Sequence, residues 1–451
     1  MAVTKLFGAK IKRREDPRLV TGNATYTDDV KLPAMLHAAF VRSPHAHARI
    51  RRVDTSEARK APGVVAVFTG ADLAGKVGPL PCAWLIPNAE LKTPPHPAIA
   101  VDRVRYVGDA VAVVLADDRY LAKDAAELVR VEYEPLPVLT DAEQATRAGA
   151  TVLHDGVAQN VAFRWKVVGG DIATAFAQAD RVIKQRLVNQ RLIANAMETR
   201  ASVADFRPST GELTLWVTSQ NPHIHRVILS GVLGIPEHKF RVISPEVGGG
   251  FGSKIFVYPD EAVVAFCSKA IGQPVKWVED RRENYLVTAH GRDHIADVEL
   301  AVKKDGTLLG LRGRTYANLG AYLSTAAPGI PTILHGLMLS GCYQLPAVDY
   351  EVLGVFTNTT PVDAYRGAGR PEATYVVERL MDLAAQELDI DPIEIRRRNF
   401  IPKDKFPYTT STGVSYDSGD YEQALDMAMQ MLDYAGLRQH QRRAPREGPY
   451  T

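Results

Sequence analysis

The sequence predicts a mixed α/β protein of the α+β kind with more than one domain. Residues 110–134 indicate a strand, a helix and a strand, because AVAVVLA is followed by the helical ADDRYLAKDAAELV and then by RVEYE. Residues 293–320 instead indicate two antiparallel strands that turn at Lys304-Asp305-Gly306. In residues 371–389 the apolar side chains fall on one face of a helix. At about 100–200 residues per domain, a chain of 451 residues has room for two to four domains.

The first domain is expected to span residues 1–140. MLHAAFV (35–41) and VVAVF (64–68) are apolar runs with the length of buried strands. The strand–helix–strand segment follows them. EPLPVLTDAEQA then interrupts the pattern with two prolines, which places the end of the domain near residue 140.

The second domain is expected to span residues 141–402, and residues 403–451 are expected to form a linker and the start of a further domain. Alternating apolar residues predict strands at 180–189, 200–206, 212–219 and 239–247. Helical length and end signals predict helices at 171–179, 222–235, 259–272, 371–389 and 421–435. Pro259 and Gly272 bound one of these helices, and Asp391-Pro392 supplies a capping residue and a first-turn proline for another.

Composition and charge argue against several classes of protein. The formal net charge is +2, so no broad basic surface for nucleic acid is expected. No apolar run reaches the roughly 18 residues of a membrane span, and the N-terminus lacks the apolar segment of a secretion signal. We therefore expect a cytoplasmic protein without a membrane span. Cys82, Cys267 and Cys342 lack C-x-x-C spacing, so they cannot hold an iron–sulfur cluster alone and are expected to be buried free thiols.

The glycine-rich stretch EVGGGFGSKIF (246–256) joins a predicted strand to a predicted helix. It is not a P-loop, because Ile255 follows the lysine where a P-loop has serine or threonine. It also fails the dinucleotide pattern G-x-G-x-x-G, since Ser253 stands at the place of the third glycine. Glycines bring main-chain N–H groups close to a ligand, and Phe251 would then form a pocket wall. The alternative is a turn that only allows the strand and the helix to pack closely.

A second loop, VDAYRGAGRPE (362–372), carries Arg366 and Arg370 directly before a predicted helix. Free N–H groups, the positive end of the helix dipole and an arginine together make an anion site. The alternative is that both arginines pair with local acids such as Glu372.

A third loop, WVTSQNPHIH (216–225), ends a strand and leaves Gln220 before a helix. Its amide can donate a hydrogen bond to an oxo group or accept one from a hydroxyl. His223 and His225 are two residues apart, so on a helix they point to different sides and do not suggest a zinc site. His290 and His294 lie in a segment that we expect to be a strand and are discounted as well.

SQNPHIH, EVGGGFGSK and DAYRGAGRPE, in this order, resemble the molybdenum hydroxylases: xanthine dehydrogenase, aldehyde oxidoreductase and the large subunit of aerobic carbon monoxide dehydrogenase. The segment from REDPRLVTGN to LHAAFVRSPHAHARI (14–50), with PGVVAVFTGADL (62–73), resembles the family's N-terminal hammerhead domain. The similarity runs from residue 10 to about 435. It implies an α/β-hammerhead domain followed by the first molybdopterin-binding α/β domain.

The resemblance implies a molybdenum held by a pyranopterin, in bacteria usually the cytosine dinucleotide form, with no metal ligand from the protein. Such sites hydroxylate an electron-poor carbon of a small organic substrate, such as an aldehyde or an N-heteroaromatic ring, with oxygen from water. Gln220 would donate a hydrogen bond to the apical oxo group, and Arg366 would face the substrate. The full set of site residues implied by the motifs is Gln220, Gly249, Gly250, Phe251, Gly252, Arg366, Gly367 and Ala368.

Electrons would pass to a separate [2Fe–2S] small subunit and then to an FAD-binding medium subunit, in a dimer of heterotrimers. The family's catalytic glutamate belongs to a second cofactor-binding half, which we expect to lie outside this chain or on a separate C-terminal polypeptide. We therefore expect the isolated chain to be inactive. The alternative is a non-catalytic remnant that binds the iron–sulfur and flavin subunits as a scaffold, and a more remote one is an unrelated nucleotide-binding enzyme.

Two positions depart from particular members of the family. Carbon monoxide dehydrogenase has a copper-binding cysteine where this chain has Gly367. Purine-oxidising members have a glutamate where this chain has Ile255. Neither carbon monoxide nor xanthine is therefore the expected substrate.

Overall fold

The computed structural model describes residues 9–443, which form two compact units built from separate stretches of the chain. The first unit contains residues up to 81, 95–137 and 193–288. The second contains residues 82–94, 138–192 and those from 289 onward. The short strand β9 (Leu192–Ile193) lies where the chain passes from the second unit to the first. Each unit contains residues from both sides of position 140, whereas the predicted domains are continuous stretches of the chain. The predicted domain boundaries stay a prediction.

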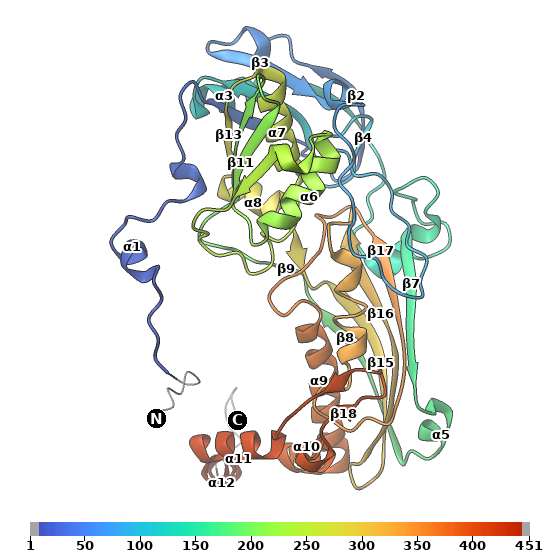
Figure 1. The fold of residues 1–451 in the computed structure, drawn as a ribbon. Helices are drawn as coiled ribbons and strands as arrows, with labels where there is room; N and C mark the ends of the chain where they lie inside the picture. Colours follow the sequence, from blue (N-terminus) through green and yellow to red (C-terminus); the bar gives the residue numbers. More distant parts are fainter. Residues whose placement is uncertain (1–8, 444–451) are drawn as a thin grey trace. The chain divides into compact units, whose positions relative to one another are not determined.

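The first unit is built on two sheets. The strands of its larger sheet are β1 (Leu36–Arg42), β3 (Val64–Thr69), β5 (Ala110–Ala116), β10 (Ala201–Arg207), β11 (Glu212–Val217), β12 (Phe240–Ile243) and β13 (Val275–Val278). They lie in the order β12-β11-β10-β13-β1-β5-β3. Figure 1 labels β3, β11 and β13 of this sheet. The smaller sheet contains β2 (Ala48–Asp54), β4 (Arg103–Val104) and β6 (Arg130–Pro135). The helices are α1 (Asp16–Val20), α2 (Gly70–Leu73), α3 (Arg119–Glu127), α6 (Pro222–Leu233), α7 (Pro259–Ile271) and α8 (Arg281–Val287).

Strand β5 is buried along its whole length because helices cover both faces of the sheet at this point. Val113 and Leu115 belong to the apolar core that includes α6 and α7. Ala112 and Ala116, on the opposite face, pack in clusters that include α3. A strand that is covered on both faces requires apolar residues at every position, and β5 has such a sequence, AVAVVLA.

One prediction for the first unit is confirmed and another needs correction. The segment 110–134 forms a strand, a helix and a strand, as β5, α3 and β6, and these two strands belong to different sheets, since β6 pairs with β2. The alternating pattern of RVEYE suits a strand with one covered face, whereas β5 has two. The strand predicted at 239–247 ends at Ile243, two residues before Pro245.

The second unit is built on a five-stranded sheet with the order β7-β17-β16-β15-β8. Its strands are β7 (Val161–Gly169), β8 (Arg181–Asn189), β15 (His294–Val302), β16 (Leu308–Gly320) and β17 (Ala347–Phe356). Shorter strands are β14 (His290–Gly291), β18 (Tyr408–Thr409) and β19 (Ser415–Tyr416). The helices are α4 (Ala142–Ala145), α5 (Ile172–Ala177), α9 (Arg370–Leu388), α10 (Pro392–Asn399), α11 (Tyr421–Leu432) and α12 (Tyr434–Arg443).

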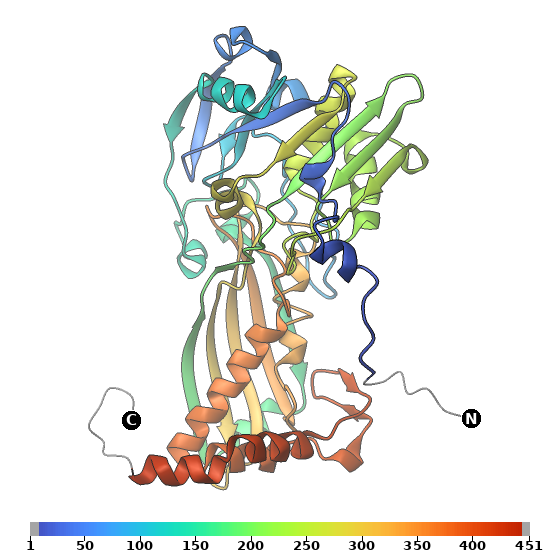
Figure 2. The same ribbon diagram turned by 90° about the vertical axis from the view of Figure 1, so that its left-hand side faces the viewer.

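Helix α9 covers one face of the five-stranded sheet (Figure 2). Its predicted apolar face is the buried one: Val376, Leu380 and Ala384 pack in the core with side chains of β15, β16 and β17. The hairpin predicted at 293–320 is present as β15 and β16, with Gly306 at a φ of 91° in the turn. The helix predicted at 421–435 is instead two helices, because Asp433 takes a left-handed φ of 47° between them.

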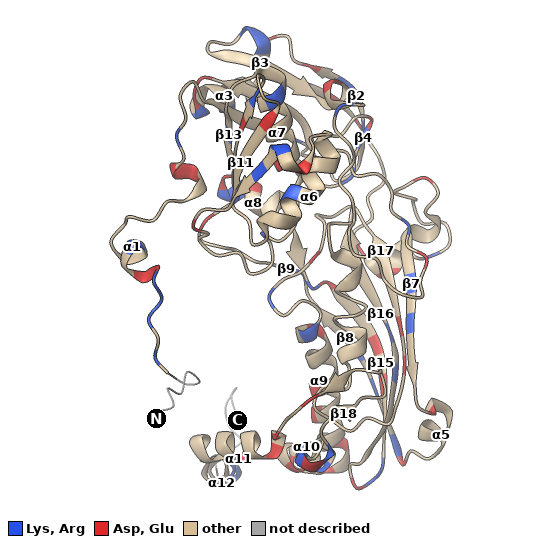
Figure 3. Cartoon of the chain, in the orientation of Figure 1, with Lys and Arg blue, Asp and Glu red and all other residues tan. Residues whose placement is uncertain are grey.

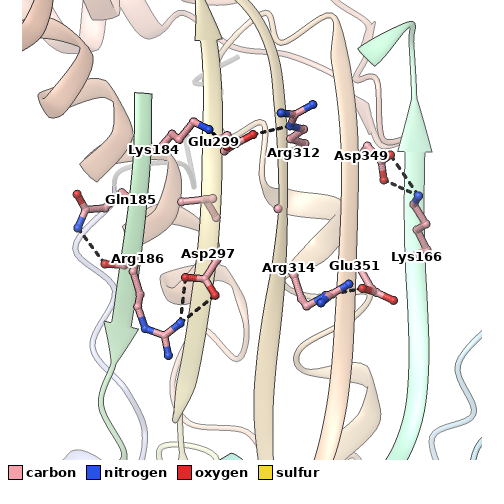
Figure 4. A pocket seen from close by; sticks show the side chains of 12 residues that line it. Lys166, Lys184, Gln185, Arg186, Asp297, Glu299, Arg312, Arg314, Asp349 and Glu351 are labelled. Atoms are coloured by element: carbon pink, nitrogen blue, oxygen red, sulfur yellow. Dashed lines mark hydrogen bonds and ion pairs between the residues drawn. The ribbon is translucent and has the colours of Figure 1, made fainter. Parts of the chain in front are cut away.

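The other face of this sheet carries a charge ladder of ten residues. Each strand contributes two charges of one sign, and the sign alternates from strand to strand: Lys184 and Arg186 on β8, Asp297 and Glu299 on β15, Arg312 and Arg314 on β16, Asp349 and Glu351 on β17, and Arg164 and Lys166 on β7. Ion pairs join neighbouring strands, such as Lys184 Nζ to Glu299 Oε1 at 2.7 Å (Figure 4). All of the ladder except Arg164 lines an open hollow of about 770 Å³. The six cations of the ladder outnumber its four carboxylates, but every one of the ten charges has an ion-pair partner within the ladder.

Charged residues of both signs occur in each unit (Figure 3), in keeping with the net charge of +2. No helix among residues 9–443 is long and apolar enough to span a bilayer. The three cysteines are free thiols, as predicted. Only Cys267 is fully buried, whereas Cys82 and Cys342 are half-buried, which corrects that part of the prediction.

Two histidines are buried beneath the five-stranded sheet of the second unit. The rings of His294 and His335 lie 5.2 Å apart, and Thr315 Oγ1 lies 3.4 Å from His335 Nε2. Burial lowers the pKa of His294 to about 3, with a further contribution from Arg292. Burial also lowers the pKa of His335 to about 3, and His294 adds to this shift. Both imidazoles are therefore neutral in the folded chain at neutral pH.

We expect acidification to destabilise the chain through these two histidines. The unfolded chain gains protons below a pH of about 6.5, whereas the folded one resists protonation until far lower pH. The free energy of unfolding therefore decreases as the pH falls. For two such groups the decrease between pH 7 and pH 5 is about 4 kcal/mol in total. Urea unfolding at both pH values measures the loss, and NMR should show two imidazoles that do not titrate in this range. Titration of both rings near pH 6 would contradict the prediction.

Candidate functional site

The glycine loop, residues 248–254, joins β12 to α7 in the first unit. Gly249 and Gly252 have φ values of 94° and 107°, which side chains rarely allow. Phe251 between them also has a positive φ, 54°, and is 41% exposed. A large apolar residue held in a left-handed conformation and left open to solvent is a costly arrangement, and such strain is concentrated at binding sites.

The amide of Gln220 is fixed against this loop. Its Oε1 accepts hydrogen bonds from the main-chain N–H groups of Gly252, at 2.9 Å, and Lys254, at 3.3 Å. Its own main-chain N–H donates to Lys254 O at 2.8 Å. Two N–H donors require the amide oxygen at that position, so the NH₂ group must be the free end of the side chain. Gln220 is exposed, and its NH₂ group has no partner among residues 9–443.

Three consecutive main-chain donors lie unused in the same loop. The N–H groups of Gly249, Gly250 and Phe251 make no hydrogen bond within the part of the chain that the structure describes. Gly250 is buried, and a buried N–H group without a partner is costly. These donors and the NH₂ group of Gln220 suit a ligand rich in oxygen or sulfur acceptors. The loop thus fits a molybdenum–pyranopterin, and the alternative of a turn that serves packing alone does not explain the unused donors.

Two residues that the sequence analysis did not select hold the glycine loop from its other side. Glu198 accepts the N–H of Gly248 through Oε2 at 2.7 Å. The buried Lys254 donates its Nζ to the same oxygen at 2.8 Å and to Glu198 O at 2.9 Å. Burial lowers the pKa of Lys254, an effect that Glu198 opposes. Nothing in the sequence pairs these residues, because 56 positions separate them.

His225 supports the turn that carries Gln220 and is not placed as a metal ligand. Its Nδ1 lies 3.0 Å from Ser219 Oγ and 3.1 Å from Asn221 Oδ1, and its Nε2 lies 3.2 Å from Glu261 Oε2. Burial alone would lower the pKa of His225, but the Glu261 carboxylate raises it above its ordinary value. His223 is exposed on the same helix. Among residues 9–443 no group of three or more His, Cys, Asp or Glu side chains could hold a metal ion.

The arginine turn, residues 363–370, leads into α9 in the second unit. Gly367, Ala368 and Gly369 have consecutive φ values of 91°, 43° and 84°. Arg366 is exposed, and its side chain makes no ion pair or hydrogen bond within the described residues. Glu372 pairs instead with Arg292, at 3.4 Å, so the alternative in which Glu372 neutralises Arg366 is wrong.

Gly367 has no room for a side chain. A Cβ atom built there would lie 2.5 Å from Pro371 Cγ and 2.7 Å from Pro371 Cδ. The proline belongs to the first turn of α9, so it cannot move aside freely. A cysteine at this position would require a different path for the turn.

The predicted site residues are thus distributed over the two units. Gln220 and residues 249–252 are brought together in the first unit by direct contacts, whereas Arg366, Gly367 and Ala368 form the arginine turn of the second. The roles assigned to these residues stay predictions.

Comparison with known proteins agrees with the architecture. The family model described as the molybdopterin cofactor-binding domain matches residues 153–400, and the aldehyde oxidase and xanthine dehydrogenase a/b hammerhead domain matches residues 21–137. The carbon monoxide dehydrogenase large chain of Hydrogenophaga pseudoflava is 41% identical over 455 residues, which cover 97% of this chain and 56% of that protein. The nicotine 6-hydroxylase large subunit of Paenarthrobacter nicotinovorans is 37% identical and covers 99% of this chain and 54% of its own length.

The crystal structure of quinoline 2-oxidoreductase from Pseudomonas putida 86 superimposes with a TM-score of 0.92 at 37% identity, over 97% of this chain and 55% of that one. The chain spans about half the length of the relatives it matches. The predicted fold class, a hammerhead domain followed by a molybdopterin-binding domain, is confirmed. The chain therefore belongs to the xanthine dehydrogenase family of molybdenum hydroxylases.

Proposed function

We propose that the chain acts in the large subunit of a molybdenum-dependent oxidoreductase that hydroxylates an electron-poor carbon with oxygen from water. The observation that carries the proposal is the set of outward donors in the glycine loop. The NH₂ group of Gln220 and the N–H groups of Gly249, Gly250 and Phe251 are all left without partners among the described residues. Such fixed donors stabilise an electron-rich oxygen or sulfur without reorganisation.

Each residue has a defined role in this proposal. Gln220 donates through its NH₂ group to an oxygen of the bound cofactor, and the three N–H groups hold further acceptor atoms. Phe251 forms an apolar wall that excludes water from the reacting carbon. When bound, the molybdenum–pyranopterin, which we propose to be the cytosine dinucleotide form, supplies the oxygen-transfer and two-electron chemistry. The protein contributes position and electrostatics.

Arg366 is proposed to bind and orient the substrate, with Gly367 and Ala368 shaping the turn beside it. Its guanidinium has no counter-ion among the described residues, so it is free to pair with a polar or anionic group. A charged hydrogen bond of this kind contributes about 1.5–3 kcal/mol. This suits a carbonyl oxygen or a ring nitrogen in the substrate.

We propose an N-heteroaromatic compound or an aldehyde as the substrate class. Two relatives at 37% identity are named for nicotine and for quinoline, both of which contain a nitrogen heterocycle. Copper-dependent oxidation of carbon monoxide is disfavoured, because Gly367 stands where the copper-binding cysteine would be and has no space for a side chain. Ile255, in place of glutamate, disfavours a purine.

The proposed assembly follows the names of the relatives, which are described as a large chain and a large subunit. We propose a [2Fe–2S] small subunit and an FAD-binding medium subunit as partners, in a dimer of heterotrimers in the cytoplasm.

The decisive experiment co-expresses the chain with a C-terminal half and the two electron-transfer subunits in a host supplied with molybdate. Stoichiometric molybdenum in the purified complex, together with dye reduction by an N-heteroaromatic substrate, supports the proposal. Stable binding of the partner subunits without molybdenum overturns it and favours the scaffold. Carbon monoxide and xanthine serve as control substrates and should give no reduction.

Gln220→Ala tests the oriented amide within that complex. We expect kcat to fall about 10- to 100-fold while the molybdenum content stays close to that of the wild type, because a hydrogen-bonding neighbour is lost but the N–H donors remain. Gln220→Glu is the matched variant, since it keeps the accepting oxygen and replaces the donor. Wild-type kcat in both variants would contradict the role.

A further inference from the structure

A second arginine lies directly behind the arginine turn. Arg292 donates from Nη1 to Tyr365 O and from Nη2 to Arg366 O, each at 2.8 Å. Its guanidinium also lies over the Tyr365 ring, 4.8 Å from the ring centre. The side chain is 8% exposed, so these contacts are shielded from water. The planar guanidinium of Arg292 thus donates hydrogen bonds to two consecutive carbonyl groups of the turn.

The main chain around Arg292 is shaped to the same turn. A Cβ atom at Gly291 would lie 2.4 Å from Tyr365 Cβ, so only glycine allows this approach. Main-chain hydrogen bonds join His290 N to Pro361 O, at 3.0 Å, and Asp363 N to His290 O, at 2.8 Å. Arg292 itself has a left-handed φ of 64°. Residues 290–292 therefore form a cradle that fixes the start of the turn.

A third arginine fastens the segment that precedes the turn. Arg191 donates from Nη1 to Thr360 O at 2.7 Å and pairs through Nε with Asp293 Oδ2 at 2.8 Å. Asp293 directly follows Arg292 in the chain. The turn and its approach are thus both anchored to residues 290–293.

Arg292 also has an acidic partner, Glu372, which lies farther from its guanidinium than the two carbonyl oxygens do. Glu372, in the first turn of α9, is 1% exposed and lies 3.4 Å from Nη1. This distance is longer than the two contacts with the turn, so the carboxylate balances the charge while the carbonyls fix the geometry. Arg366, by contrast, has a side chain without any partner among the described residues.

We propose that Arg292 is a positioning residue that sets the direction in which Arg366 leaves the turn, with Glu372 holding Arg292 in place. The inference rests on the proposed function of Arg366 as a substrate-binding residue. Arg292 touches no substrate in this account, because its side chain is buried and its donors are engaged with main-chain oxygens.

The first test needs no activity. Hydrogen exchange of the purified chain is followed by mass spectrometry for the peptide spanning 362–371 and for a reference peptide from β16. In Arg292→Met the turn peptide should exchange about tenfold faster or more, since two charged hydrogen bonds are lost. In Arg292→Lys the increase should be smaller, because an ammonium can reach one carbonyl but not both. The reference peptide should be unchanged, as should both peptides in Arg164→Met on the charge ladder, whose strand β7 lies outside both peptides.

Equal exchange of the turn in wild type and Arg292→Met overturns the proposal. An increase that spreads equally to β16 does the same, because it shows a general loss of stability and not a local one. If Arg292→Met does not fold, Arg292→Lys supplies the comparison. These outcomes are independent of whether the complex is active, so they separate this inference from the proposed function.

The second test is a double-mutant cycle in the active complex. Arg292→Met should lower kcat/KM about tenfold at wild-type molybdenum content, by raising KM more than it lowers kcat, since one oriented charged hydrogen bond is misplaced. In the Arg366→Ala background the same change should have no further effect, because Arg292 acts through Arg366. Additive losses in the double variant overturn the positioning role.

Discussion

Replacing Arg200 by methionine should lower the free energy of unfolding by about 3–5 kcal/mol, because it removes a buried guanidinium that pairs with two buried carboxylates. The guanidinium is 1% exposed. It donates to Asp260 Oδ2 at 3.0 Å and to Glu279 Oε1 at 2.6 Å, and it lies 3.7 Å from the centre of the Tyr258 ring. Urea denaturation at neutral pH measures the loss.

The same network makes the effect depend on pH. Burial alone would raise the pKa of Asp260, but Arg42 and Arg200 outweigh it and hold the pKa below its ordinary value. The stability that Asp260 contributes is therefore present above the ordinary pKa of a carboxyl and is lost as pH falls through the lowered one. In Arg200→Met part of this contribution is already missing. The difference in the free energy of unfolding between the wild type and Arg200→Met should therefore become smaller below a pH of about 4.

The matched control is Lys60→Met, which removes an ion pair with Glu57 whose side chains are 72% and 59% exposed. Exposed ion pairs contribute roughly 0–1 kcal/mol to stability, so the free energy of unfolding should hardly change in this variant. A loss for Arg200→Met no larger than that of the control would show that the buried network does not stabilise the chain.

Gly250→Val should abolish the loading of the cofactor into the assembled complex. A Cβ atom at this position would lie 2.4 Å from Gln220 Oε1 and 2.6 Å from Gln220 Cδ. The first collision of the side chain is therefore with Gln220. The Gly252 and Lys254 N–H groups hold this amide, so the main chain at Gly250 must shift to admit the valine, and the N–H donors of Gly249, Gly250 and Phe251 move out of place with it. Molybdenum content per complex, measured by elemental analysis, should fall to background.

Gly231→Val provides the control for this change. Gly231 lies in α6 of the same unit, and a Cβ atom there meets no other atom within 4 Å. This variant should load molybdenum like the wild type. Wild-type loading in Gly250→Val would show that the loop does not bind the cofactor.

The sequence was sufficient for features that depend on local pattern. Helix α9 could be predicted because its apolar residues repeat along one face, and the β15–β16 hairpin because Lys304-Asp305-Gly306 suits a turn. The glycine loop and the arginine turn were visible as motifs, since unusual backbone angles demand glycine at fixed positions.

Features that join distant segments were not predictable in this way. Strand β5 was recognised, but its separation from β6 depends on pairing with β1 and β3, which no local pattern encodes. Glu198, Arg200 and Arg292 are ordinary charged residues in the sequence, and their roles arise only when partners from 50 to 80 positions away meet them. A single sequence without relatives contains no signal for such pairs.

The charge ladder limits how the second unit can change in evolution. The inner residues of the ladder other than Asp349 lie opposite two residues of the other sign, as Glu299 does between Lys184 and Arg312. A reversal of one sign places like charges directly opposite one another on both neighbouring strands, which is destabilising. Substitutions here should therefore be inherited as compensating pairs, and a strand that slipped by one residue would drive its two charges into the apolar core. Such a slipped chain would be strongly destabilised, because burying unpaired charges is costly.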